Sequence, residues 1–289
     1  MQYKLFSGVG SALIIFLIVS TSTSYAHGIE LHVDDSWKEC SMVLDPSLTQ
    51  DAWRQFTREA GIMAVFNPLT SAQPLGKWNF DIGLSMSMYF IDDKDAAWND
   101  TFVHPYPTHW LYGEVSDDHD VDAKNHPESL HSLNLPLILV RMGVTDQIDV
   151  GLFYFSATPD ANYAFRGGQV QYNFFNDEEK NLSAAARLSI GQIYKVDDFD
   201  LSTYSIDVVA SKDFSHLISF AGLSGYAGLS GYLARSHENT SAVDLDDENV
   251  FGLQGNAGIN ALFFSHLNIG VQLTVGALIY PSLVIGFAR

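Results

Sequence analysis

The sequence has 289 residues, 47% of them apolar, and a formal net charge of −19. This acidity disfavours nucleic acid as a partner, because binding to phosphates needs clustered Lys and Arg. Its single cysteine, Cys40, excludes an intramolecular disulfide.

The first 26 residues have the pattern of a secretory signal peptide. Lys4 precedes the apolar run ALIIFLIV (residues 12–19), and Ser24 and Ala26 are the small residues expected before a cleavage site. An uncleaved membrane anchor is the rival interpretation, but the run is short for a span. We therefore expect export, with cleavage after Ala26.

Residues 27–76 do not alternate and form a predicted N-terminal periplasmic segment. Trp53, Phe56 and Ala60 recur near helical spacing and Thr49 is a candidate N-cap, which predicts a helix over about 50–65. The helix could plug a pore or pack across the periplasmic mouth of a barrel. We favour the second interpretation, because closing a barrel end needs only an amphipathic face.

The stretch WNFDIGLSMSMYF, residues 78–90, carries apolar side chains at every even position from Trp78 to Phe90. Strict alternation is the period of a β-strand. At about 3.3 Å per residue the stretch is about 43 Å long, enough to cross about 30 Å of hydrocarbon when tilted. The even face is therefore expected to meet lipid.

Alternating segments recur to the C-terminus, and we count ten strands in residues 77–289. In each strand, one of the two alternating sets of side chains is apolar and is expected to face lipid, for example Leu135 and Leu139, or Leu223 and Leu229. The predicted fold is all-β: a transmembrane antiparallel up-and-down β-barrel of about ten strands, or twelve if the N-terminal segment pairs. The long connections, about 92–128 and 235–249, fall on one side, as external loops do.

The last strand alternates Leu283, Ile285 and Phe287, which resembles the C-terminal signal read by the outer-membrane insertion machinery, although Ala288 and Arg289 follow it. We expect the outer membrane of a Gram-negative bacterium. The expected partners are its lipid and lipopolysaccharide, the insertion machinery and periplasmic chaperones.

Two stretches resemble known families. LPLILVRMGVTDQIDVGLFY, residues 135–154, resembles the strand, G-[LV]-T-D turn and strand of many outer-membrane barrels, among them the phenol-degradation-pathway barrels grouped with small-molecule transporters. DPSLTQDAWRQF (45–56) with FNPLTSAQPLG (66–76) resembles an uncharacterised proteobacterial family of exported proteins. The first resemblance implies fold more than substrate, and neither carries over a catalytic residue.

The strand faces opposite the lipid are rich in amides and hydroxyls and carry few charges. Such a face can line a narrow channel for a small polar or amphiphilic solute, or form a packed interior whose polar groups satisfy one another, because ten strands enclose little space. Both interpretations stay open. The candidate lumen-lining residues are Asn79, Asp81, Asp149, Gln169, Gln171, Asn173, Arg187, Asp207, Gln254, Asn256, Asn260 and Gln272.

The first long connection holds half of the ten histidines, mixed with aspartates. Imidazole and carboxylate suit zinc or similar ions, yet no motif such as H-E-x-x-H is present. The rival interpretation is a solvated acidic loop that bridges lipopolysaccharide through a divalent cation. We expect no other cofactor. The candidate metal ligands are His104, His109, Asp117, Asp118, His119 and Asp120.

An outer-membrane protease is a further class, since Asp92, Asp93 and Asp95 with the DDHD stretch supply paired carboxylates and a histidine. These lie in one connection and no nucleophile and base are positioned together, so we expect no enzyme. The favoured function is a passive channel or transporter for a small solute. The alternative is a non-conducting structural or surface-interaction barrel.

Overall fold

The computed structural model describes residues 42, 44–67, 69–92, 95–99, 101, 132–156, 163–215, 221–241 and 243–289. The chain divides into two compact units, Met1–Trp37 and Lys38–Arg289, and every described residue belongs to the second. The predicted signal peptide (1–26) and all six candidate metal ligands lie outside the described residues.

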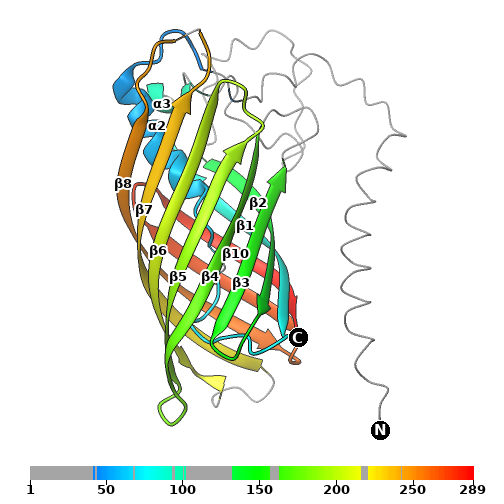
Figure 1. Ribbon diagram of the computed structural model, residues 1–289. Helices are drawn as coiled ribbons and strands as arrows, with labels where there is room; N and C mark the ends of the chain where they lie inside the picture. Colours follow the sequence, from blue (N-terminus) through cyan, green and yellow to red (C-terminus); the bar gives the residue numbers. More distant parts are fainter. Residues whose placement is uncertain are drawn as a thin grey trace, which may run out of the picture. The chain divides into compact units, whose positions relative to one another are not determined.

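The second unit is a closed antiparallel barrel of ten strands, as predicted (Figure 1). Each strand pairs with its neighbours in sequence, and β1 also pairs with β10 to close the cylinder. The strands are β1 (Phe80–Phe90), β2 (Ser132–Gly143), β3 (Ile148–Ser156), β4 (Ala164–Asp177), β5 (Leu182–Tyr194), β6 (Phe199–Asp213), β7 (Ala221–Glu238), β8 (Glu248–Phe263), β9 (Leu267–Val275) and β10 (Ile279–Ala288).

The alternation of the sequence becomes an outer and an inner face. Leu84 of β1 and Leu229 of β7 are 57% and 75% exposed, whereas their neighbours Ser85 and Ser230 are buried. A closed barrel satisfies every ladder hydrogen bond internally, so its outer face can be apolar. Neither helix among the described residues is long and apolar enough to span a membrane.

Strand β2 departs from this expectation. Leu135, Leu137 and Leu139 point inward and are at most 4% exposed, whereas Ile138 points outward. Both alternating sets of this strand are apolar, so its pattern could not tell the two faces apart. The leucines turn inward because the barrel interior at this level is an apolar core.

Helix α2 spans Gln50–Met63, within the predicted range, and the Thr49 hydroxyl accepts a hydrogen bond from the Ala52 amide as its N-cap. A short second helix, α3, spans Ala96–Asn99. Helix α2 packs against β6, β7 and β8. Its buried face, with Trp53 and Phe56, joins the core inside the barrel.

The helix lies at the opposite end of the barrel from the one predicted. Gln50 bonds to Asp246 in the β7–β8 connection, and Leu44 donates its amide to Asp198 in the β5–β6 connection. This is the end of the long connections, far from the β4–β5 turn (Figure 1). We call it the helix end and the other the turn end. An amphipathic pattern shows that a helix has a buried face, but not which end of the barrel buries it.

After α2 the chain runs back through the barrel as an extended segment that we call the plug segment, residues 64–67 and 69–79. Glycines on the inner face of the wall make room for it: a Cβ on Gly191 would lie 1.7 Å from the Ala64 carbonyl oxygen. Near the turn end the chain reverses at Gly76 and Trp78, which have φ of 81° and 66°, and enters β1.

Candidate functional site

The structure places most of the predicted lumen-lining side chains inside the barrel. Asn256 and Asn260 are half-buried, and the prediction for Asn79 was wrong. Asn79 is exposed in the reversal before β1, where its side-chain amide donates to the Leu75 carbonyl. The buried members of the set are Asp81, Asp149, Gln169, Gln171, Asn173, Arg187, Asp207, Gln254 and Gln272.

Several of these side chains bond to the plug segment instead of facing an open channel, namely Asp149, Gln171, Asn173 and Arg187. Arg187 of β5, 3% exposed, donates through Nη2 to the Thr70 and Ser71 carbonyls at 2.9 and 3.1 Å. Its Nε donates to Gln171 Oε1 at 2.8 Å. A buried guanidinium thus satisfies carbonyl groups that an extended chain cannot satisfy by itself.

A second buried arginine, Arg141 of β2, was missed by the sequence analysis. Its Nη1 donates to Thr70 Oγ1 at 2.6 Å, and its Nη2 lies 3.2 Å from Asp149 Oδ2. Asp81, on the neighbouring strand, lies 3.8 Å from it. The sequence did contain a signal for this residue. Arg141 is the one basic residue of a mostly apolar strand, and it pairs with Asp81 in the β1–β2 register.

The remaining contacts hold the plug segment along its length. Asp149 accepts the Leu75 amide at 3.1 Å through both carboxylate oxygens. Asn173 donates to the Ala72 carbonyl at 3.0 Å, and the Ala72 amide donates to Ser211 Oγ at 3.1 Å. Five strands therefore contribute polar groups to one short stretch of backbone: β2, β3, β4, β5 and β6.

Other buried polar atoms of the inner wall have no partner among the described residues. They include Ser85 Oγ, Gln169 Nε2, Thr203 Oγ1, Asp207 Oδ1, Ser230 Oγ, Gln254 Oε1 and Asn256 Oδ1. An unpaired buried polar group costs about 1–3 kcal/mol. The plug segment therefore satisfies only part of the polar inner wall of the barrel.

The helix end is built differently. Trp53 stacks on Phe56 at a ring-centroid distance of 5.7 Å, and the Phe199 ring meets both edge-on at 5.4 and 5.5 Å. Trp98 of α3 contacts Phe56 at 5.2 Å. Aromatic groups in such contacts bury large apolar areas. This end of the lumen is closed by side-chain packing.

One carboxyl group lies at the border of that apolar cluster. Glu59 of α2 accepts hydrogen bonds from Trp98 Nε1 and Gln55 Nε2. Burial raises its pKa above the ordinary value, and the two hydrogen bonds oppose this shift only in part. The charge of Glu59 therefore affects the stability of α2 in its packed position.

The described part of the chain offers no support for the metal site or for the protease considered in the sequence analysis. No three His, Cys, Asp or Glu side chains gather there in a way that could hold a metal ion. Asp95, one of the suspected protease carboxylates, caps α3 by accepting the Ala97 amide and also bonds to Gln55. Its role in the structure is to begin a helix.

No protein-family model matches the chain, and no curated protein is similar to it in sequence. Several solved structures resemble it weakly. The N-terminal β-barrel domain of OprF from Pseudomonas aeruginosa is 12% identical with a TM-score of 0.31, covering 74% of this chain and 99% of that one. The translocator domain of the autotransporter NalP from Neisseria meningitidis is 8% identical with a TM-score of 0.37, covering 74% and 88%.

A third similar structure, the KdgM porin, is 5% identical with a TM-score of 0.33 and covers 72% of this chain and 98% of that one. The resemblance to phenol-degradation-pathway barrels stays a prediction. The function therefore has to be inferred from the barrel's own residues.

Proposed function

We propose that this chain is an outer-membrane β-barrel that passes a small polar or amphiphilic solute when its plug segment leaves the lumen. Two groups of aromatic side chains on the outer face support the membrane location. Phe174, Phe264 and Phe287 lie at the turn end, and Tyr154 and Phe251 lie near the helix end. Aromatic girdles of this kind mark the two interfaces of outer-membrane barrels.

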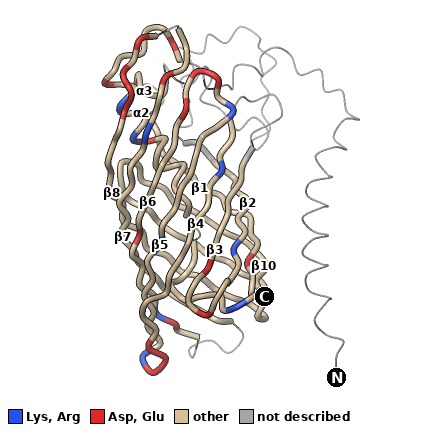
Figure 2. The backbone as a smooth tube through the Cα atoms, viewed as in Figure 1, with Lys and Arg blue, Asp and Glu red and all other residues tan. Residues whose placement is uncertain are grey.

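The orientation follows from the lengths of the connections. Short turns face the periplasm and longer loops face outward in such barrels. The turn end is then periplasmic, and α2 sits in the external mouth. Acidic stretches lie in the connections at this mouth (Figure 2), and the β7–β8 connection contributes Asp244, Asp246 and Asp247. We propose that these acidic loops bind divalent cations that bridge lipopolysaccharide.

The observation that carries the channel function is the set of unpaired polar atoms buried on the inner wall of the barrel. A permanently dry interior is expected to be apolar or fully paired, because each unmet group costs free energy. Gln169 Nε2, Gln254 Oε1 and Asn256 Oδ1 are instead buried on the inner wall without a partner among the described residues. Water would satisfy all three in a state from which the plug segment had moved.

The aromatic packing of α2 favours a second candidate, a barrel that conducts nothing. Trp53 and Phe56 are fully buried, and a helix seated in this way closes the lumen whatever the plug segment does. A structural or surface-interaction barrel would need no opening. Single-channel conductance of the refolded full chain separates the two candidates.

Arg187→Gln is the test variant, with Arg166→Gln as its control. Arg187 holds two plug carbonyls, whereas Arg166 is exposed on the outer face of β4, where it bonds to Gln192 and lies over the Tyr194 ring. Losing charge-assisted hydrogen bonds at 1.5–3 kcal/mol each predicts about a tenfold or greater rise in the open fraction. If neither the variants nor the wild type shows single-channel conductance, the non-conducting barrel is favoured.

An engineered disulfide between the plug segment and the wall makes the same test reversibly in one molecule. Ala72→Cys and Ser211→Cys place thiols on two residues joined by the Ala72 amide–Ser211 Oγ hydrogen bond, and Cys40→Ser removes the native thiol. Combined with Arg187→Gln, the oxidised form is expected to be silent and reduction to restore conductance. Conductance that is indifferent to the redox state would show that the solute path does not require plug movement.

A further inference from the structure

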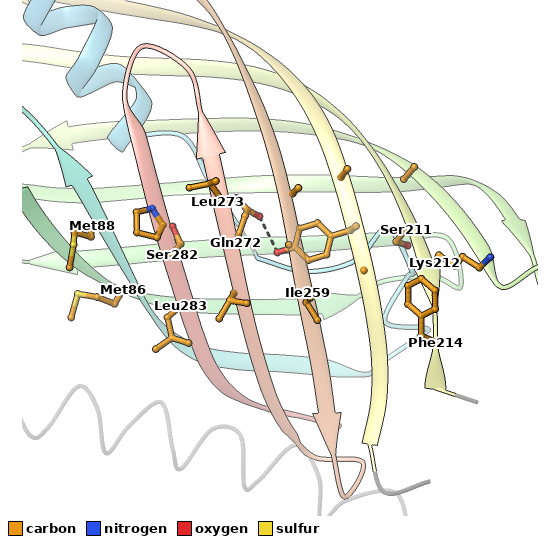
Figure 3. A pocket seen from close by; sticks show the side chains of 18 of the residues that line it. Met86, Met88, Ser211, Lys212, Phe214, Ile259, Gln272, Leu273, Ser282 and Leu283 are labelled. Atoms are coloured by element: carbon orange, nitrogen blue, oxygen red, sulfur yellow. Dashed lines mark hydrogen bonds between the residues drawn. The ribbon is translucent and has the colours of Figure 1, made fainter. Parts of the chain in front are cut away.

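The outer wall of the barrel is hollowed by an apolar groove of about 1160 Å³ (Figure 3). It crosses the lipid-facing side of the wall from Leu182 of β5 to Met86 and Met88 of β1. Most of its lining is apolar, and the few uncharged polar side chains that border it, such as Gln272, belong to the inner face. The groove is thus separate from the plugged lumen.

Small side chains form the floor of the groove. Ala210, Ala227 and Ala257 are paired in register across β6, β7 and β8, and Gly225 lies next to this row. Elsewhere on the outer face these strands carry larger groups, such as Ile206 on β6, and Ile259 and Leu283 rise beside the floor (Figure 3). A row of alanines between bulky neighbours leaves a depression in the wall.

One charged side chain lines the groove. Lys212 is exposed on the outer face of β6 near the turn end, and its Nζ lies 5.9 Å from the centre of the Phe214 ring. No carboxylate of the described residues forms an ion pair with it. A lysine beside an aromatic ring at a barrel end sits where a long side chain can place its charge at the membrane interface.

We propose that this groove is a binding site for one anionic glycerophospholipid of the periplasmic leaflet. The acyl chains lie over the Ala210–Ala227–Ala257 floor, and the phosphate group pairs with Lys212. The apolar lining matches hydrocarbon, and the unpaired ammonium supplies the charge that an anionic headgroup needs. A second copy of the barrel fits less well, because its own apolar wall would leave Lys212 uncompensated.

The proposal rests on the membrane location proposed above, but not on conduction. Native mass spectrometry of the full chain, refolded in detergent and mixed with phosphatidylglycerol or phosphatidylcholine, counts the bound lipids. The wild type is expected to retain one phosphatidylglycerol about fivefold more than phosphatidylcholine, the preference that one Lys–headgroup contact supplies. Lys212→Gln should lose the preference.

Filling the floor with Ala227→Leu should lower retention of both lipids without changing the preference for the anionic one. Lys180→Gln, in the β4–β5 turn and paired with Asp177, is the charge control, and Ala186→Leu on the outer face of β5 is the volume control. Equal binding of both lipids by the wild type, unchanged binding by Lys212→Gln, or a dimer in place of a lipid complex would each overturn the site. Single-channel conductance of the same preparation tests the channel function separately.

Discussion

The two ends of the barrel interior hold the same N-terminal chain by different means. At the helix end, α2 is packed by aromatic rings such as Phe56, Phe199 and Trp98. At the turn end, the plug segment is held by hydrogen bonds from polar side chains such as Arg187 and Asn173. One end is closed by packing, and the other by directional polar contacts.

The difference follows from the backbone. A helix pairs its own N–H and C=O groups, so its apolar face can be buried against an apolar wall. An extended segment has no such internal partners, and every buried amide and carbonyl must find one on the wall. The inner face therefore changes from Leu135 and Phe153 at the helix end to Arg141 and Asp149 towards the turn end.

Removing the central ring of the packed end should have the largest effect. Phe56→Ala deletes a fully buried side chain that contacts three other rings, and such changes cost about 3–5 kcal/mol. If packing is the main seal, this variant opens the channel more than Arg187→Gln. Thermal unfolding and conductance measure the two effects, with Leu229→Ala on the outer face as the control. A stability equal to that of the wild type would contradict the packed-end model.

A smaller effect is expected where the two regions meet. Gly191→Ala places a methyl group against the Ala64 carbonyl, directly after α2, so the chain must shift. Overpacking of this kind costs about 1–3 kcal/mol. Hydrogen exchange at residues 64–67 should accelerate. The control is Gly231→Ala, whose added Cβ meets nothing closer than 3.5 Å. Matching exchange in the two variants would mean that the plug segment is not confined at Gly191.

The smallest effect concerns pH. Because burial raises the pKa of Glu59, the seated helix binds a proton more tightly than the displaced helix. The stability of the seated state therefore falls as pH rises from the ordinary glutamate pKa through the raised one. The difference in melting temperature between the wild type and Glu59→Gln should change across this window and become constant above it. A constant difference throughout would exclude Glu59 as the titrating group.

The sequence predicted the barrel well where its two faces differ in chemistry. On β5 and β6, apolar residues such as Leu188 and Ile206 alternate with Arg187 and Asp207, so each face could be assigned and was assigned correctly. On β2, Leu137 alternates with Ile138, and the direction of the leucines was decided by the core they meet. Periodicity assigns a face only when one set is polar.

The plug segment could not be predicted from its own residues. It has no periodicity, and its conformation is imposed by groups far away in the chain, such as Arg187 and Ser211. Thr49 and the apolar spacing did predict α2, because those signals are local. The end of the barrel at which α2 sits depends on contacts to the β5–β6 and β7–β8 connections, which no local pattern encodes.

The pairing of β1 with β10 has a consequence for assembly. The plug segment runs directly into β1, and β1 pairs with β10, so the cylinder closes only where two strands far apart in the sequence meet. We expect the sheet to close around α2 and the plug segment, since this avoids threading them through a finished ring. Barrel closure and enclosure of the N-terminal segment are then a single step in assembly. Because contacts between strands far apart in sequence form slowly, this predicts slow maturation.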